Sequence, residues 1–400
     1  DNTEIAANVD EDIIDSLTGG RLVGSVTSFE NFAECPLRYY LRYGVDLKER
    51  EEFTFSPVNF GVVLHAVIRE VCDEIKKNGE SYYLISEEKR REMVKRSVAA
   101  ITDIYQNSIL KDSSRNSFMI KRMEDLADRT VWAMGEQLKC GDFVPFVFEH
   151  KFNMEVGDGD RKQLMSGTID RVDICENGTD VYVRIIDYKT GKKDFNIVKT
   201  YYGIDIQLMV YMEAAMKLVA KMRPGKNVIP AGVFYYNISD PIVSATTESA
   251  EEIEDKIKGE LRLKGMVNSD KDIAEKMDNN EGTSLNIPVS RKADGGFDSR
   301  RSKVMNTEQF NMLGRFVDVR AVDTADRIAG GDIRRSPYKD GQFSSCDRCP
   351  YGAVCGFSVD LPGCNYRKLK KFDDEVLWNN IKEGVDENGK KMDTGAEECD

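Results

Sequence analysis

The chain has 400 residues, of which 40% are hydrophobic and 9% aromatic, so it contains enough apolar material for a real core in one elaborated domain or in more than one. It has no apolar run long enough to cross a bilayer and no charged-then-apolar leader, which argues against a membrane protein or a secreted precursor. We therefore expect a soluble, cytoplasmic protein. The chain begins with Asp1 rather than Met, which suggests a processed chain or a fragment of a longer one.

The formal net charge of −13 is concentrated at the two ends. Residues 1–20 carry six acidic and no basic side chains, and residues 373–400 carry ten acidic and three basic ones, so these two tails account for the whole imbalance. The body, residues 21–372, is neutral, and the acidic total therefore does not exclude nucleic acid as a partner. We expect both tails to be disordered.

A short helix is predicted over Phe29–Gly44, with Ser25 or Thr27 as its cap. The segment interleaves aromatic and basic side chains, among them Arg38, Tyr39 and Arg42. Rings that stack on bases, next to guanidinium groups that meet phosphates, would suit single-stranded DNA. An ordinary amphipathic helix whose arginine heads reach into solvent explains the pattern equally well.

Residues 57–140 are interpreted as a helical insertion, with helices over Pro57–Asn78, Glu87–Leu110 and Phe118–Lys139. The first helix carries His65, one of only two histidines, on the same side as Val62, Ile68 and Cys72. A lone histidine on an apolar face is usually a core residue. It becomes a candidate ligand only if other metal-binding side chains lie near it.

The catalytic core is predicted at residues 143–236, with strands over Phe143–Val156, Leu164–Ile174, Val181–Tyr188 and Ile229–Tyr236. A helical pattern over Tyr201–Met222 separates the last two strands. This order predicts a mixed sheet flanked by helices. The turn residues 176–180 (ENGTD) join the second and third strands into a hairpin.

Charged residues end an apolar face of this hairpin. Because alternate residues of a strand share a face, Asp187 and Lys189 follow Val183 and Ile185 inward. The simplest interpretation is an Asp187–Lys189 ion pair at a strand end. With Asp170 on the neighbouring strand, the same residues would hold a divalent cation against a phosphate and activate a water molecule.

Beyond the core, helices are predicted over Ser249–Lys264 and Thr307–Ile328. Residues 270–296 are weakly patterned and are expected to form an irregular insertion with one strand near Ser284–Val289. The motif G-x-x-x-x-G-K-[ST] does not occur, so ATP hydrolysis is not encoded here by that loop.

The nine cysteines are not expected to form a disulfide framework, because no secretory signal is present. Cys346, Cys349 and Cys355 form a C-x2-C-x5-C pattern within residues 333–357, which indicates a metal or cluster site. Three others fall in periodic segments and are expected to be buried apolar residues, namely Cys72, Cys140 and Cys175.

Several of these motifs together resemble the RecB-type branch of the PD-(D/E)XK nucleases. They are GVVLHAV around His65, GTIDRVD around Asp170, DYKTG from Asp187, and QLMVY with Gln207 and Tyr211. The resemblance implies a restriction-endonuclease-like α/β core. It implies Mg²⁺ ligation by His65, Asp170, Asp187 and the carbonyl of Tyr188. Lys189 would orient or activate the attacking water, and Gln207 and Tyr211 would lie on a helix that faces the site and the DNA.

The cysteine pattern extends the resemblance. FAECPLRYYLRYG around Cys35 and SCDRCPYGAVCGF around the C-x2-C-x5-C motif resemble the split iron–sulfur motif of the AddB subunit of AddAB helicase–nucleases, over Ser25–Phe357. This implies a [4Fe–4S] cluster held by Cys35, Cys346, Cys349 and Cys355, which would staple together the two ends of the domain. A structural zinc site is the alternative, since four cysteines also hold zinc. Cys364 is a substitute candidate for Cys35.

We therefore expect residues 21–372 to form a Mg²⁺-dependent exonuclease domain of an AddB-like subunit. It would act on single-stranded or double-stranded DNA ends in double-strand break repair, with an AddA-like ATPase subunit as partner. Candidate DNA-binding residues are Arg38, Tyr39, Arg42, Lys192 and Lys193. The alternatives are a stand-alone RecB-like iron–sulfur exonuclease, as in CRISPR adaptation, and a noncatalytic DNA-binding scaffold. The presence of Asp170, Asp187 and Lys189 argues against the scaffold.

Overall fold

The computed structural model describes residues 8–10, 13, 23–48, 57–105, 114–156, 163–243 and 249–394. The N-terminal acidic tail, residues 1–20, was expected to be disordered, and most of it lies outside these ranges. The same is true of residues 106–110, the predicted end of one helix, and of residues 395–400.

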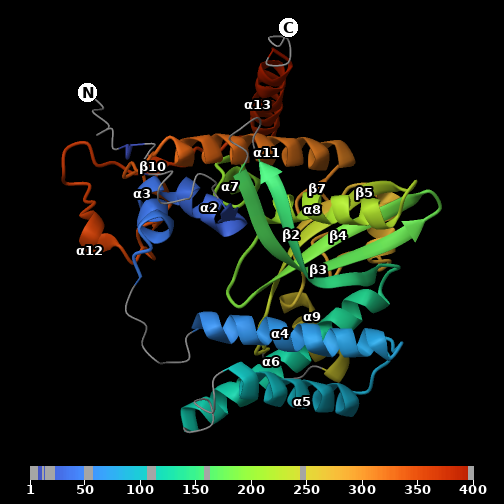
Figure 1. Ribbon diagram of the computed structural model, residues 1–400. Coiled ribbons are helices and arrows are strands. Elements are labelled where there is room, and N and C mark those ends of the chain that lie inside the picture. Colours follow the sequence, from blue (N-terminus) through green and yellow to red (C-terminus); the bar gives the residue numbers. More distant parts are fainter. Residues whose placement is uncertain are drawn as a thin grey trace.

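A seven-stranded mixed sheet forms the centre of the molecule (Figure 1). The strands are β1 (Val23–Ser25), β2 (Val144–Val156), β3 (Gln163–Asn177), β4 (Asp180–Lys189), β5 (Asn227–Asn237), β6 (Lys264–Asn268) and β7 (Val304–Met305). Their order is β1-β3-β4-β5-β6-β7, and β2 pairs with β3. The β1–β3, β4–β5 and β6–β7 pairs are parallel and the others are antiparallel. The predicted mixed sheet is thus confirmed.

The predicted hairpin consists of β3 and β4. Asn177 pairs with Asp180, so the connecting loop is only Gly178 and Thr179. Gly178 has a φ of 59°, a left-handed conformation that glycine adopts without the steric cost of a Cβ atom. The turn and the alternating strands on either side of it therefore act together to set the register.

The middle of β3 is open on one side. Opposite β2, strand β1 pairs with residues 164–166 and β4 pairs with residues 171–177. Residues 167–170 between them pair with neither strand, although residues 167–169 still pair with β2. Asp170 therefore lies where two strands diverge, and its side chain is buried there.

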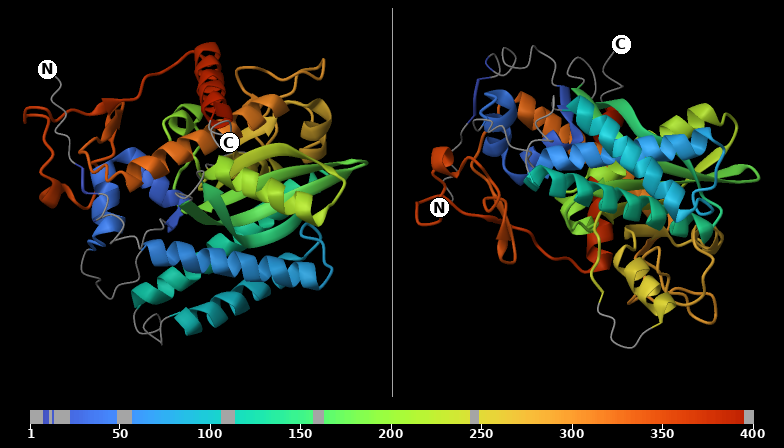
Figure 2. Two further views of the ribbon diagram at one scale, coloured as in Figure 1. Left: turned by 45° about the horizontal axis from the view of Figure 1, so that its top comes forward. Right: turned by 90° about the horizontal axis from the view of Figure 1, so that it is seen from below.

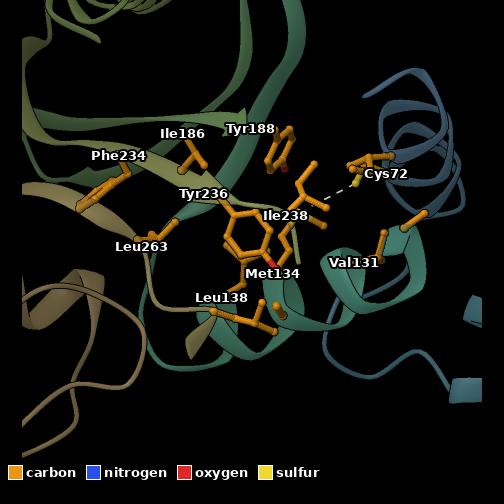
Figure 3. Packing of buried hydrophobic residues seen from close by; sticks show 14 of the residues in the cluster. Cys72, Val131, Met134, Leu138, Ile186, Tyr188, Phe234, Tyr236, Ile238 and Leu263 are labelled. Carbon is orange, nitrogen blue, oxygen red and sulfur yellow. Dashed lines mark hydrogen bonds between the residues drawn. The ribbon is translucent and has the colours of Figure 1, made fainter. Parts of the chain in front are cut away.

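Three helices cover one face of the sheet, namely α4 (Pro57–Lys77), α5 (Glu87–Tyr105) and α6 (Ser114–Lys139). They form a layer beneath the strands in Figure 1 and lie across the front of the right-hand view in Figure 2. Figure 3 shows Ile186, Tyr188 and Tyr236 of the sheet facing this layer. Cys72 of α4 contacts Met134 of α6 with 3.9 Å between the sulfur atoms, so Cys72 is the expected core residue.

The other face is covered by α2 (Val26–Glu34), α8 (Gln207–Met222) and α11 (Thr307–Ala329). Val181, Val183 and Ile185 pack against this side. Strand β4 is therefore buried on both faces, which explains its nearly continuous apolar sequence. Three shorter helices complete the domain: α7 (Ile197–Tyr201), α9 (Ala250–Glu260) and α10 (Lys271–Met277).

The single helix predicted over Phe29–Gly44 is wrong. Helix α2 ends at Glu34, Cys35 is extended, and the chain resumes as α3 (Pro36–Tyr39) and a π-helical turn, η1 (Tyr40–Gly44). Pro36 has no N–H and restricts the residue before it to extended conformations, so the helix is interrupted at Cys35. The interruption turns the Cys35 side chain away from the course of the helix.

The strand predicted near Ser284–Val289 is also wrong. This segment lies between Thr283 and Ser290, which form an isolated bridge with each other. It wraps around buried Asp278, whose carboxylate accepts hydrogen bonds from the Ser284 and Asn286 side chains at 2.5 and 3.2 Å. A local polar centre replaces a strand ladder here. The helix predicted over Ser249–Lys264 ends at Glu260, and Lys264 begins β6.

The C-terminal acidic tail was expected to be disordered, and that expectation fails for α13 (Asp374–Thr394). Leu377 and Ile381, four residues apart on one side of this helix, are buried in the core that contains α11. An apolar stripe therefore docks the helix despite its acidic composition. A small separate sheet of β8 (Tyr338–Asp340), β9 (Phe343–Ser344) and β10 (Arg367–Lys368), with α12 (Gly352–Cys355), precedes it.

Within the described part of the chain, none of the helices has the length and apolar character needed to traverse a bilayer.

Candidate functional site

Three metal-binding side chains meet at the open part of β3. His65 of α4 lies 3.4 Å from Asp170, measured from Nδ1 to Oδ1, and 3.7 Å from Glu149, measured from Nδ1 to Oε1. The ligand atoms of the three residues lie within 4.8 Å of one another. Helix α4, strand β2 and strand β3 each contribute one residue, so the group depends on the packing of all three elements.

Glu149 was not predicted from the sequence. The register pairs Phe148 with Arg171 and His150 with Ile169, which places Glu149 opposite Asp170. Its φ of 48° is rare for a residue other than glycine and interrupts the regular ladder at this point. Because this register depends on the tertiary pairing of β2 with β3, the sequence pattern alone did not distinguish Glu149 from other acidic residues on alternating strands.

The electrostatics of this group favour a positive charge between the two carboxylates. Burial alone would lower the pKa of His65, but the hydrogen bonds and charges of Asp170 and Glu149 outweigh burial and raise it to about 10. A histidine held as a cation by two acids marks a place where negative charge is in excess. The carboxylate and imidazole donors at that place suit a divalent cation.

The remaining predicted catalytic residues form a connected polar network beside this group. The Lys189 ammonium contacts the Asp187 carboxylate and also donates a 3.0 Å hydrogen bond to Oε1 of Gln207. The Gln207 amide in turn donates a 2.9 Å hydrogen bond to the Tyr211 hydroxyl. Asp187 is buried, and burial together with the charge of Asp170 raises its pKa to about 7 despite Lys189. The hairpin end and the first turn of α8 therefore meet as the sequence motifs suggested.

The polar network and the metal-binding group are joined through β4. The backbone N–H of Tyr188 donates a 2.6 Å hydrogen bond to Oδ2 of Asp170, and the Tyr188 ring packs edge-on against His65 with 5.8 Å between ring centroids. Within the described residues, Asp187 is not part of the three-residue group of His65, Glu149 and Asp170. Its role as a metal ligand, like that of the Tyr188 carbonyl, stays a prediction.

Glu30 is a second residue that the sequence did not reveal. Its Oε1 atom accepts hydrogen bonds from the backbone N–H groups of Ile206 and Gln207, at 2.9 and 3.0 Å. These donors begin α8, so the carboxyl group caps the helix that carries Gln207. Burial raises the pKa of Glu30 to about 7. Because Glu30 and Cys35 share one short stretch of chain, this contact connects the cysteine region with helix α8.

Two of the candidate DNA-binding residues have partners inside the protein. Lys193 pairs with Asp205 at 3.0 Å and lies over the Tyr235 ring, 4.5 Å from its centroid. The ring of Tyr39 is buried against Phe32 in an edge-on contact. Both side chains thus support the structure around the site.

Of the other three candidates, Arg42 and Lys192 are exposed, whereas Arg38 is half-buried. Arg38 pairs with Glu34 on the preceding turn of chain, Arg42 lies over the Tyr43 ring, and Lys192 is exposed. Their roles in DNA binding stay predictions.

The four predicted cluster ligands line one small cavity, although Cys35 is separated from the others by almost the entire domain. In all views the orange segment with Cys346, Cys349 and Cys355 runs beside the blue helices α2 and α3 (Figures 1 and 2). Burial raises the pKa of Cys35, Cys346 and Cys355, and each also senses the charge of neighbouring cysteines. Cys364 is buried but does not line this cavity.

Hydrogen bonds also join the two ends of the domain around this cavity. Arg367 donates to the carbonyls of Ser336 and Glu34, at 3.0 and 3.2 Å. The Tyr351 hydroxyl donates a 3.0 Å hydrogen bond to the carbonyl of Leu47. The cavity is therefore built by contacts that do not involve the cysteines themselves.

Comparison with known proteins agrees with this geometry. Residues 24–356 match the model of the PD-(D/E)XK nuclease superfamily. The chain is 34% identical over 399 residues to the B subunit of the ATP-dependent helicase/deoxyribonuclease of Lachnoclostridium phytofermentans, covering 97% of this chain and 34% of the relative. Proteins of the same name from Thermoanaerobacter sp. (strain X514) and Clostridium acetobutylicum are 33% and 34% identical, covering 92% and 93% of this chain and 33% of each relative. The chain thus spans about a third of the length of these relatives.

Proposed function

The chain belongs to the PD-(D/E)XK nuclease superfamily, and from this premise we propose a more specific function. Membership confirms the predicted fold and the predicted class of enzyme, a metal-dependent nuclease. It is the nuclease domain of an AddB-type helicase/deoxyribonuclease subunit and hydrolyses phosphodiester bonds at DNA ends as an exonuclease during double-strand break repair. The convergence of His65, Glu149 and Asp170 beside the Asp187–Lys189–Gln207 network is the observation that carries this proposal.

The donor set fits Mg²⁺. Two carboxylates are hard oxygen ligands, and the imidazole completes a site whose negative charge is uncompensated unless His65 is protonated. His65, Glu149 and Asp170 would hold the ion, with Asp187 and the Tyr188 carbonyl as the further predicted ligands. When bound, the ion supplies Lewis-acid stabilisation of the negative charge that develops on the phosphate.

Lys189 is the group of this chain that would act on the reacting atoms. Its ammonium lies between Asp187 and Gln207, which leaves little freedom for the long side chain to move away. From this position it would donate a hydrogen bond to the attacking water or to a phosphate oxygen. Hydrolysis forms a bond from the water oxygen to phosphorus, breaks the bond to the leaving oxygen, and transfers a proton to that oxygen. Gln207, held by Tyr211, would keep Lys189 aligned for this step.

The test replaces one carboxylate at each end of β4. Asp187→Asn should lower the rate of Mg²⁺-dependent cleavage of single-stranded DNA by at least about 10²-fold, because it removes a charge that positions Lys189 and would help to hold the ion. Asp180→Asn, at the opposite end of the same strand, should cleave within about twofold of the unmodified chain. Thermal unfolding checks that both variants are folded. Cleavage by Asp187→Asn at the unmodified rate would refute the assignment.

We also propose that the four cysteines hold a [4Fe–4S] cluster. The alternative, zinc, binds sulfur at about 2.3 Å in a tetrahedron, which places the sulfur atoms about 3.8 Å apart. Among the described residues no three cysteine sulfurs gather within 4.8 Å, and this wider spread suits a multi-iron cluster better.

Metal analysis decides between the two cofactors. Anaerobically purified protein should be brown with about four irons per chain. Cys349→Ser should lose iron, whereas Cys364→Ser, outside the cavity, should keep it. A colourless protein with one zinc would exclude the cluster.

An AddA-like ATPase subunit is the proposed partner, and the bacterial cytoplasm is the proposed location. The relatives are named as subunits of a helicase/deoxyribonuclease, which favours this assembly over a stand-alone exonuclease. The complete set of charged residues at the site argues against a noncatalytic scaffold.

A further inference from the structure

Four arginine side chains line one cleft that the cleavage site does not use. Arg320 and Arg327 come from α11, Arg334 follows that helix, and Arg367 belongs to β10. The cleft has a volume of about 240 Å³, and Phe32 and Tyr202 contribute aromatic walls. None of these residues belongs to the His65–Glu149–Asp170 group or to the polar network from Asp187 to Tyr211.

The cleft carries more positive than negative charge. Asp332 pairs with Arg327 and Arg334, at 2.8 Å in each case. Among the salt bridges of the described residues, Arg320 pairs with Asp323 at 3.7 Å. The buried Nε atom of Arg320 has no hydrogen-bond partner in the described part of the chain. Among the described residues, Arg367 therefore has no ion-pair partner, and Arg320 has only the longer pair with Asp323.

Arg367 shows the consequence of this excess. Its hydrogen bonds go to the backbone carbonyls of residues 33, 34 and 336, which are neutral acceptors. Burial and the charges of Arg327, Arg320 and Arg334 outweigh the opposing effect of Cys35 and lower the pKa of Arg367. Buried charges of one sign are costly unless an anion joins them.

A second cleft continues from the first, because Tyr202 and Arg320 line both. It has a volume of about 610 Å³ and adds Lys370 and Phe372 to its walls. The rings of Tyr202 and Phe372 lie nearly parallel, with an interplanar angle of 25° and 6.4 Å between centroids. Cations and aromatic rings thus line one continuous surface, together with the carboxylate of Glu383.

We propose that these two clefts bind a single-stranded nucleic acid outside the cleavage site. Arg320 and Arg367 bind phosphate oxygens, which match the planar guanidinium fork. Tyr202 and Phe372 contact the bases, because aromatic faces beside cations hold single strands with little regard to sequence. The inference rests on the proposed nuclease function, since the strand held here is the one that the catalytic site shortens.

The test measures binding of a fluorescent oligothymidylate to the full chain in EDTA, where it is not cleaved. Arg320→Gln should weaken binding about fivefold to tenfold and reduce the slope of log K against log salt by about 0.7, the loss of one single-strand phosphate contact. Arg315→Gln, which removes an exposed arginine from the same helix but not from the cleft, should change neither quantity.

Two further measurements exclude other roles of the arginines. Iron content should be equal in Arg320→Gln and the unmodified chain; an equal loss of iron and of DNA binding would mean that the arginines balance a cluster, and would overturn the proposal. Inorganic phosphate at matched ionic strength should not displace the oligonucleotide. Displacement from the unmodified chain but not from Arg320→Gln would identify a site for free phosphate instead.

Cleavage with Mg²⁺ separates this inference from the proposed function. Arg320→Gln should raise KM for a long single strand and leave kcat unchanged, because the cleft binds the strand and does not touch the reacting phosphate. Unchanged binding in Arg320→Gln overturns the inference even if the chain cuts DNA. Conversely, weakened binding in a chain that never cuts supports the cleft and refutes the nuclease.

Discussion

Strands β3 and β4 carry two buried clusters of charge that differ in how the charge is balanced. In the first cluster, Arg171 and Arg184 both donate hydrogen bonds to Asp173, at 2.6 to 2.9 Å, and all three residues are at most 1% exposed. In the second, Asp170 lies at the open middle of β3 and Asp187 lies near the end of β4. The two clusters are only a few residues apart in the sequence, and each contains buried aspartate.

The pKa values of the two aspartates shift in opposite directions. Burial raises the pKa of any carboxyl group, but the two arginines outweigh burial at Asp173 and lower its pKa. At Asp187, burial and the charge of Asp170 prevail over Lys189 and raise the pKa to about 7. A carboxylate surrounded by guanidinium groups is structurally satisfied, whereas one that faces other carboxylates still needs a cation. The comparison therefore separates a structurally satisfied cluster from the proposed catalytic one by their charge balance.

Asp173→Ala tests the structural side and has the largest expected effect. Removing the carboxylate leaves two guanidinium groups buried without their partner, which should lower the free energy of unfolding by about 3–5 kcal/mol. Urea unfolding of the full chain measures this loss. Replacing all three residues together, as Arg171→Met, Asp173→Leu and Arg184→Met, should recover most of the stability, because no unpaired charge then remains. A loss below about 1 kcal/mol for Asp173→Ala would contradict the distinction.

Glu149→Gln tests the catalytic side and should have a smaller effect that depends on metal. In EDTA its free energy of unfolding should lie within about 1 kcal/mol of the unmodified chain, because the variant relieves repulsion between carboxylates as it removes one partner of His65. Saturating Mg²⁺ or Mn²⁺ should raise the Tm of the unmodified chain and raise that of the variant much less, since a bound ligand stabilises only the state that binds it. Glu155→Gln, exposed on the same strand β2, is the matched control. An equal metal-dependent rise in Glu149→Gln would remove Glu149 from the site.

Local patterns predicted much of the catalytic region. The hairpin follows from alternating apolar residues around a turn with Gly178, and the Gln207–Tyr211 pair follows from helical spacing. Each of these features is set by residues close together in the chain. Glu149 and Glu30 could not be found in this way, because each is defined by its contact with a distant element, β3 and α8 respectively.

Elements with mixed signals were the least predictable. In the prediction for residues 373–400, the acidic composition received more weight than Leu377 and Ile381, the two apolar residues that dock α13. The residues around Ser284 alternate in polarity like a strand, although hydrogen bonds to Asp278 hold them as a loop. In both cases a few buried contacts decided the conformation.

The sequence by itself determined which side chains could perform metal-dependent hydrolysis, because residue types and short spacings are written directly into the chain. Only the tertiary structure decided that Glu149 joins His65 and Asp170, that Cys35 reaches the cysteines of the other end, and that four arginines share one cleft. Such groupings depend on strand register and helix docking, which arise from the burial of apolar surface over the whole domain and not from any local pattern.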